Sequence, residues 1–150
     1  MAFGKLGKKV MAYARIKSPW ILHLDTGGCN GCAIETFAIL SPRYDVERFG
    51  GVSKANPRHS DILVISGSVT RKIEPMLRRV YDQTPEPKAV IAVGSCAITK
   101  GVFHDSYNVS GPLDRVMPVD IYVPGCPPKP EAILQGVVKA LEIWKERYDV

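Results

Sequence analysis

The sequence lacks a long apolar run, a low-complexity tract and an internal repeat. Its longest apolar stretch, about residues 89–98, is far shorter than the roughly 20 residues of a bilayer-spanning helix. The basic N-terminus also lacks the continuous apolar segment of a secretory signal. We therefore expect an intracellular protein, and 150 residues suffice for one domain with its own hydrophobic core.

Cysteine and histidine are scarce, with four and three residues respectively. Thiols stay reduced inside cells, so disulfides are not expected and a metal-binding or redox role for the cysteines is favoured. His23 alternates within a strand-like run, where a packed core histidine is expected. His59 and His104 fall in loops, where His104 could face a partner, and we assign no metal to any of the three.

Acidic residues are absent from the first 17 positions, which carry the whole net charge of +5. The basic residues there are Lys5, Lys8, Lys9, Arg15 and Lys17. Residues 1–17 therefore predict a basic N-terminal arm or amphipathic helix. It would lie on an anionic membrane surface or an acidic partner, or else be a solvated, frayed terminus. Nucleic-acid binding needs basic residues interleaved with aromatics over a folded face, and this pattern is absent.

From residue 18 to residue 150 the pattern is that of one α/β domain. Apolar strand-like runs alternate with helical periodicity, which is typical of a parallel sheet with helices on both faces. The expected strands are residues 20–24, 46–49, 61–65, 89–93 and 119–123. We therefore predict a single flavodoxin-like domain over residues 18–150, with its site at the carboxyl ends of the strands.

Three helices are expected, two between these strands and one after the last strand. The first covers about residues 32–40 and is expected to bury Ile34 and Phe37. The second presents an apolar face from Ile73 to Tyr81. The third opens at Pro130, with an inner face made of Ile133, Leu134, Val137, Val138, Leu141 and Trp144. The connection of residues 99–118 is long for a compact domain, so we expect it to be functional or to contact a partner.

The four cysteines lie in segments rich in glycine. Cys29 and Cys32 lie in GGCNGC, Cys96 in VGSCA and Cys126 in VPGCPP. These segments lie where apolar strand-like runs end. Because the carboxyl ends of parallel strands meet at one edge of a sheet, the sequence predicts that four thiols distant in sequence lie close together.

Four explanations of these cysteines remain open. Each could be a small buried hydrophobe, which glycine-flanked loops disfavour for all four. Cys29 and Cys32 at a helix start resemble a thioredoxin-type dithiol, which leaves Cys96 and Cys126 unexplained. Structural zinc prefers two close pairs in a small module. An iron–sulfur cluster tolerates scattered thiolates and a proline such as Pro127 after a ligand, so a four-iron cluster is favoured.

Segments along almost the whole chain after Trp20 carry a family resemblance. They are Arg43-Tyr44-Asp45, Arg48-Phe49-Gly50, Pro57-Arg58, residues 77–83, Pro85-Glu86-Pro87, residues 94–97, Asp114-Arg115 and residues 118–128. The chain resembles the small (20-kDa, B-type) subunit shared by respiratory complex I and nickel–iron hydrogenases. The resemblance implies that Cys29, Cys32, Cys96 and Cys126 ligate one 4Fe-4S cluster, next to the active site of a larger subunit.

Two positions distinguish branches of this family. Complex I subunits have two adjacent cysteines, whereas the spaced pair Cys29 and Cys32 resembles energy-converting, membrane-bound hydrogenases. These take electrons from ferredoxin, reduce protons and pump ions. Many of them carry an acidic residue after the second cysteine, where this chain has Ala33, as in complex I. A related complex that reduces polysulfide or a quinone therefore stays open.

The resemblance also implies partners and a location. The partners are a large catalytic subunit, a ferredoxin-type iron–sulfur subunit and membrane-arm subunits. This chain would be a peripheral subunit on the cytoplasmic face of the cell membrane, and we expect it to carry electrons without independent catalysis.

Several polar residues have open roles. By resemblance, Glu35 matches a glutamate that helps move protons near the partner's active site, and an ordinary solvated carboxylate is the alternative. Ser66, Gly67 and Thr70 line the cluster pocket or cap the next helix, and N-capping by Thr70 is favoured. Three arginines pair with a partner, tune the cluster or face solvent: Arg43, Arg48 and Arg58.

Overall fold

The structure, a computed structural model, describes residues 5–148. Its centre is a five-stranded, entirely parallel sheet with the order β2-β1-β3-β5-β7. The strands are β1 Trp20–Asp25, β2 Val52–Ser53, β3 Ile62–Ser66, β5 Ala89–Val93 and β7 Ile121–Val123. This is the flavodoxin-like order, in which the chain reverses direction across the sheet between β1 and β3. The predicted fold class is confirmed.

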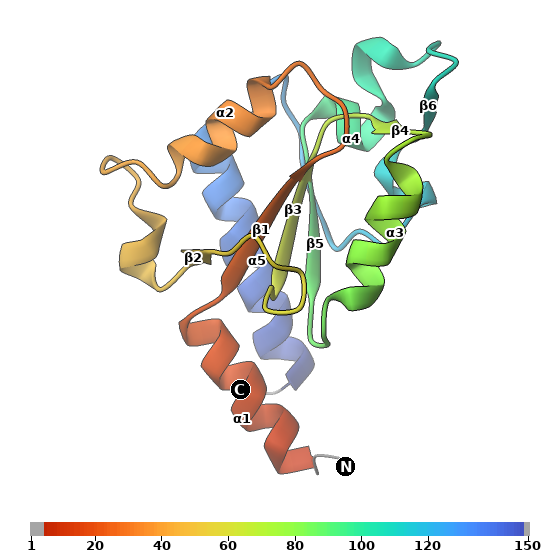
Figure 1. Ribbon diagram of the computed structural model, residues 1–150. Coiled ribbons are helices and arrows are strands. Elements are labelled where there is room, and N and C mark those ends of the chain that lie inside the picture. The colour runs from red at the N-terminus through yellow and green to blue at the C-terminus, as the bar shows by residue number, and fades with distance from the viewer. Residues whose placement is uncertain (1–4, 149–150) are drawn as a thin grey trace.

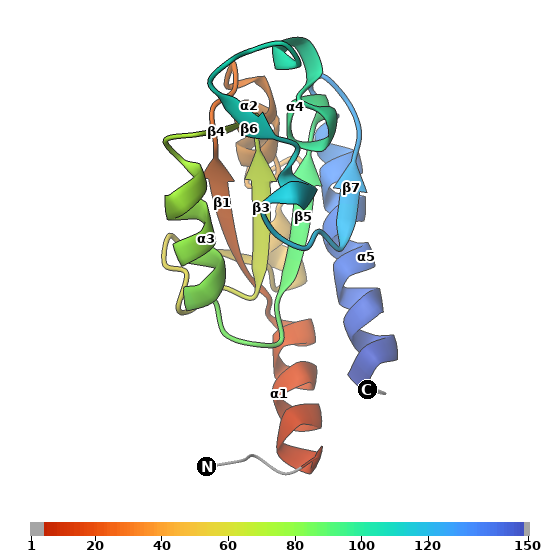
Figure 2. The same ribbon diagram turned by 90° about the vertical axis from the view of Figure 1, so that its right-hand side faces the viewer.

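Helices cover both faces of the sheet, as Figures 1 and 2 show. The helices are α1 Lys5–Lys17, α2 Gly31–Ala38, α3 Glu74–Gln83, α4 Ser95–Thr99 and α5 Pro130–Tyr148. One face packs against α5, α2 and α1, and the other against α3 and α4.

Strand β3 shows why both faces must be covered. All five of its residues are buried. Ile62 and Val64 face the core that includes Trp144 of α5, whereas Leu63 and Ile65 face the core that includes Leu77 of α3. Successive side chains in a strand point to opposite faces, so a continuous apolar run stabilises two cores at once.

The connection of residues 99–118 is folded rather than irregular. It contains two 3₁₀ turns, η2 Gly101–Phe103 and η3 Leu113–Arg115, and strand β6 Val109–Gly111. Strand β6 pairs antiparallel with β4 Val69–Thr70. Leu113 is fully buried and anchors this segment over the α3 face of the sheet. Its predicted contact with a partner remains a prediction.

The predicted strand at residues 46–49 is wrong. This segment forms a 3₁₀ turn, η1 Val46–Phe49, between Asp45 and Gly50, which both have positive φ angles. Amides of the turn are bonded back to carbonyls three residues earlier, as from Gly50 to Glu47. Val46 is buried against the α5-side core, so its apolar character reflects burial in a turn and not a strand.

Three residues assigned to the core from their helical spacing are exposed instead. Ile34 and Phe37 of α2 are 66% and 56% exposed, because α2 packs through the smaller Ala33 and Thr36. On α5, Val138 is 53% exposed, although Trp144 at the far end of the helix is buried as expected.

Helix α1 packs against α5 at the end of the sheet opposite to α2 and α4 (Figure 1). The Nε of Arg15 lies 3.0 Å from Oδ1 of Asp61, and a second guanidinium nitrogen of Arg15 donates to the carbonyl of Pro87. The predicted arm is therefore a docked helix from residue 5 onward, and its residues 1–4 lie outside the described residues. No helix within residues 5–148 is long and apolar enough to cross a bilayer.

Candidate metal centre

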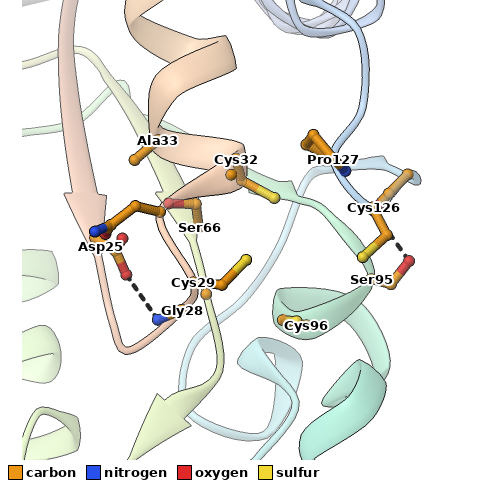
Figure 3. Close-up of a pocket in the computed structure, with 14 residues that line it drawn as sticks. Asp25, Gly28, Cys29, Cys32, Ala33, Ser66, Ser95, Cys96, Cys126 and Pro127 are labelled. Atoms are coloured by element: carbon orange, nitrogen blue, oxygen red, sulfur yellow. Dashed lines mark hydrogen bonds between the residues drawn. The ribbon is translucent and has the colours of Figure 1, made fainter.

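All four cysteines line one pocket at the carboxyl ends of the strands. Its other lining residues are Asp25, Gly28, Asn30, Gly31, Ala33, Ser66, Gly67, Ser95, Gly125 and Pro127. Figure 3 shows the four cysteine side chains arranged around this pocket. The predicted convergence of the cysteines is therefore present in the fold.

Each cysteine enters the pocket from the end of a different element. Cys29 lies in the loop after β1, and Cys32 lies in the first turn of α2. Cys96 lies in the first turn of α4 directly after β5, and Cys126 lies in the loop after β7. The short helix α4 was not predicted, because its five residues are too few to show a period.

Hydrogen bonds tie these loops to one another. The backbone N–H and the hydroxyl of Ser95 both donate to the carbonyl of Gly125, at 2.8 and 3.1 Å, which joins the Cys96 and Cys126 segments. The buried hydroxyl of Thr26 donates to the carbonyls of Ser66 and Gly67, which joins the β1 and β3 loops. The positions of the sulfurs are thus fixed by backbone contacts between loops.

Glycines make room for three of the four sulfurs. A Cβ on Gly94 would lie 2.4 Å from the Sγ of Cys32, and a Cβ on Gly101 would lie 3.1 Å from the Sγ of Cys96. A Cβ on Gly31 would lie 3.5 Å from the Sγ of Cys29. Gly94 also has a φ of +87°, which only glycine adopts readily. A side chain at Gly94 or Gly101 would take space that a bulky group bound to the sulfurs needs, whereas the contact at Gly31 is an ordinary one.

The buried thiols are held in their neutral form. Burial raises the pKa of the Cys32 thiol to about 11, and Cys96, Cys29 and Cys126 add to the rise. Burial also raises the pKa of Cys96, against a hydrogen bond with the Ser68 side chain. The raised pKa makes the Cys32 thiol a poor nucleophile at neutral pH. Cys32 and Cys96 are therefore stable as thiolates only when a cation offsets their charge.

Within residues 5–148, no three His, Cys, Asp or Glu side chains lie close enough to hold one metal ion. A tetrahedral zinc ion with bonds of about 2.3 Å would hold its sulfurs only ~3.8 Å apart. A cluster places a cage of iron and sulfide between its thiolates and accepts a wider separation. Donor type and the glycines around the sulfurs therefore fit an iron–sulfur cluster.

Asp25 lines the pocket, although no motif in the sequence predicted it. Its Oδ1 accepts hydrogen bonds from the backbone N–H groups of Gly27 and Gly28, at 2.9 and 3.1 Å. Figure 3 shows the second of these bonds. On the same face of β1, His23 forms a 2.9 Å hydrogen bond with Ser66 and packs edge-on against Phe37. Asp25 is the last residue of β1, and only the strand boundary could have indicated it.

Ser66 and Gly67 line the pocket, as one of the two predicted alternatives required. Thr70 does not cap the next helix. The N-cap of α3 is Ile73, without a side-chain hydrogen bond, and the Thr70 hydroxyl donates to the carbonyl of Thr26 instead. Thr70 belongs to strand β4, which pairs with β6, and this strand ends before α3 begins.

Glu35 is half-buried on α2 and is not among the residues that line the pocket. Glu35 lies near Tyr44. Tyr44 donates a 2.9 Å hydrogen bond to Glu131 at the start of α5. This bond and the nearby carboxylates, Glu35 among them, raise the pKa of Tyr44. The proton-relay role of Glu35 therefore stays a prediction.

The remaining predicted residues lie elsewhere on the surface. Arg43 lies over the ring of Tyr44, and His59 packs edge-on against Trp20. His104 contacts the neighbouring Asp105 in the connection of residues 99–118. Neither histidine lines the pocket.

Comparison with known proteins places this geometry in context. A family model described as the 20-kDa subunit of NADH ubiquinone oxidoreductase matches residues 29–140. The probable membrane-bound hydrogenase subunit mbhJ of Pyrococcus furiosus is 55% identical over 126 residues, which cover 84% of this chain and 75% of that protein.

Solved structures agree with this relationship. A chain of the membrane-bound sulfane sulfur reductase, an archaeal respiratory membrane complex, matches with a TM-score of 0.80 and 40% identity, over 92% of this chain and 76% of that chain. A chain of an NAD⁺-reducing NiFe hydrogenase in the H₂-reduced state matches with a TM-score of 0.63 and 22% identity, over 83% and 91% of the two chains. The latter likeness concerns the fold alone.

Proposed function

This chain belongs to the family of the 20-kDa subunit of NADH ubiquinone oxidoreductase, and on that premise we propose that it is an electron-transfer subunit. It holds one 4Fe-4S cluster next to the active site of a ferredoxin-linked, membrane-bound, ion-pumping nickel–iron hydrogenase complex. The chain is thus part of an oxidoreductase and performs no bond chemistry itself.

One observation carries the proposal: the thiols of Cys29, Cys32, Cys96 and Cys126 line a single pocket. They come from loops and first helical turns that follow three different strands, so the sheet itself fixes their arrangement. In a flavodoxin-like fold this edge is where ligands bind, and cysteine thiolates are the ligands that iron–sulfur clusters require.

A four-iron cluster, when bound, would supply reversible one-electron transfer. The four thiolates of this chain would hold it. Cys96 is buried and Cys32 is half-buried, so the sheet shields one side of the pocket from water. Cys29 and Cys126 are exposed, so the other side of the pocket faces outward. That is the side on which a large catalytic subunit would receive or deliver the electron.

The relatives support the proposed partners and location. Mbh subunit J is named for a membrane-bound hydrogenase, and the sulfane sulfur reductase is a respiratory membrane complex. By analogy, this chain would join a large catalytic subunit, a ferredoxin-type iron–sulfur subunit and membrane-arm subunits. It would be peripheral, on the cytoplasmic face of the cell membrane.

A second candidate function rests on the 40% identity to the sulfane sulfur reductase chain. In that case the complex would reduce polysulfide, and a quinone is a further possible acceptor. Ala33 bears on this choice because it is buried and lines the pocket, where many membrane-bound hydrogenases carry an acid. The higher identity to the hydrogenase subunit favours proton reduction.

The full chain, purified without oxygen, tests the cluster. We expect about four irons and four sulfides per chain and a paramagnetic signal after reduction. Each of Cys29→Ser, Cys32→Ser, Cys96→Ser and Cys126→Ser should lower the iron content, whereas a serine for a residue outside the pocket should not. About one zinc per chain with no reducible signal would reject the proposal.

The intact complex tests the acceptor. Fed with reduced ferredoxin, it should release hydrogen rather than sulfide, and two Cys-x-x-Cys pairs in the large subunit would supply nickel ligands. Sulfide formation in their absence would favour the second candidate. Glu35→Gln should slow proton-coupled turnover and leave the cluster signal intact, and unchanged turnover would remove Glu35 from the mechanism.

A further inference from the structure

Asp25 contributes the only carboxylate, and no lysine or arginine contributes a cation, to the described residues that line the cysteine pocket. The other lining groups are thiols, hydroxyls, an amide, a proline, an alanine and glycines. Reduction of a group held there adds one negative charge. The Asp25 carboxylate is therefore the one permanent charge of the pocket wall that can discriminate between the two redox states.

The carboxylate is held in place by the backbone. Its Oδ1 accepts from the N–H groups of Gly27 and Gly28, so it is fixed at the turn that leads into Cys29. Gly67 on the neighbouring loop approaches so closely that a Cβ there would lie 2.8 Å from the same oxygen. The exposed carboxylate is thus held in place between the β1 and β3 loops on the wall of the pocket (Figure 3).

A fixed negative charge opposes the addition of an electron nearby, because like charges repel more strongly at a site partly shielded from water. Charge and burial are among the factors that set cluster potentials. We propose that Asp25 is a positioning residue that lowers the reduction potential of the cluster held by the four cysteines. The inference rests on the proposed function and specifies how this chain would match a low-potential electron donor.

Asp25 could set the reduction potential through its charge, or it could only stabilise the turn through its hydrogen bonds. Three substitutions distinguish these two roles. Asp25→Asn keeps an oxygen that can accept from Gly27 and Gly28 but removes the charge. Asp25→Glu keeps the charge. Asp25→Ala removes both the charge and the hydrogen bonds. The measurement is a redox titration of the full chain with its cluster, followed by paramagnetic resonance, with iron content and thermal unfolding recorded for each variant.

In Asp25→Asn we expect the reduction equilibrium to shift about tenfold toward the reduced state, which is about 59 mV for one electron. Iron content and unfolding temperature should stay near those of the original chain. Asp25→Glu should restore most of the original potential, which a role limited to the turn would not explain. Raising the salt concentration should reduce the difference between the original chain and Asp25→Asn, because salt screens an exposed carboxylate.

Asp82→Asn is the matched control. Asp82 is exposed near the end of α3, which leads to the amino-terminal end of β5 and thus away from the pocket. The substitution Asp82→Asn removes the same charge outside the pocket, so the reduction potential of the cluster should stay unchanged.

Two results would overturn the proposal. A potential in Asp25→Asn equal to that of the original chain, with the cluster intact, would limit Asp25 to shaping the loop. Loss of iron from Asp25→Asn would show that Asp25 acts in holding the cluster rather than in setting its potential. Failure of the proposed function itself is distinguishable, because the unsubstituted chain would then hold no reducible cluster.

Discussion

Gly94 packs so closely against Cys32 that a Cβ on Gly94 would lie 2.4 Å from the cysteine sulfur. The contact joins the end of β5 to the first turn of α2, two segments distant in sequence. We predict that Gly94→Ala costs ~1–3 kcal/mol from its φ of +87° alone. The displaced sulfur should also lower the iron content, measured per chain after anaerobic purification.

Gly31→Ala is the matched control for this prediction. A Cβ on Gly31 would make an ordinary 3.5 Å contact with the sulfur of Cys29, and Gly31 has no positive φ. It opens α2, where alanine is the better helix former. Iron content should therefore stay near normal in Gly31→Ala, and equal losses in the two variants would show that close packing at Gly94 is unimportant.

Removal of the bound group should loosen the carboxyl edge of the sheet more than its core. The four cysteines come from loops after β1, β5 and β7, so a group bound to all four joins three separate segments. A ligand that binds only the folded state stabilises it. We predict a lower unfolding temperature after chelation. Amide exchange should increase in the loops, and little in Leu63 and Ile91, which are fully buried.

A chain with all four cysteines replaced by serine gives the reference for that experiment. Chelator should not change its unfolding temperature, because it has nothing to remove. If the chelator destabilises both chains equally, its effect does not arise from the cysteine pocket.

The strands were the most predictable part of the molecule, because burial on both faces leaves a continuous apolar run. Residues 61–65 and 89–93 were identified for this reason, and they match β3 and β5 closely. Helix orientation was less predictable. Helix α2 is apolar on most sides, so its sequence does not reveal that Ala33 and Thr36, rather than Ile34 and Phe37, face the core.

The residues that line the pocket also differ in how well the sequence predicts them. Its cysteines could be found from their glycine-rich segments, because residue type alone limits what a thiol does. The place of Asp25 on the pocket wall depends on the register of β1 against β3, which pairs it with Ser66. Register is a property of the assembled sheet, and no local pattern in the sequence records it.

The ion pair of Arg15 with Asp61 joins α1 to the sheet, and we predict that Arg15→Ala destabilises the fold by about 2–3 kcal/mol. The Asp61 carboxylate is mostly buried, and it would keep only the N–H of Trp20 as a described hydrogen-bond donor. Urea unfolding near neutral pH measures the loss. An effect below about 0.5 kcal/mol would mean that the pair acts as an exposed one.

The cost of Arg15→Ala should depend on pH. Burial already raises the pKa of Asp61, and the loss of Arg15 removes a charge that lowers it. A carboxyl whose pKa is raised by folding disfavours the folded state once pH exceeds the unfolded value of about 3.9. The destabilisation should therefore shrink as pH falls toward that value. Asp61→Asn has no charge to bury at this position. In a chain that carries Asp61→Asn, the cost of Arg15→Ala should therefore not depend on pH.

His23 should make the protein less stable in mild acid. Burial lowers the pKa of His23, although the nearby Asp25 acts in the opposite direction. Below the unfolded value of about 6.5, the unfolded chain binds a proton that the folded chain does not, so folding stability falls as pH decreases. The loss ends once pH passes the lowered pKa and His23 is protonated in the folded state too. Stability lost in this window is about 1.4 kcal/mol for each unit by which the pKa is lowered.

His23→Gln tests this prediction because glutamine can still hydrogen-bond to Ser66 but does not titrate. Urea unfolding at about pH 7 and about pH 5 should show a smaller loss of stability in His23→Gln than in the original chain. His104→Gln controls for the removal of a histidine, since His104 is exposed in the connection after α4. The same pH dependence in His23→Gln and the original chain would show that acid sensitivity arises elsewhere. If only His104→Gln shows a smaller loss of stability at acid pH, the acid sensitivity arises from the exposed ring of His104 instead.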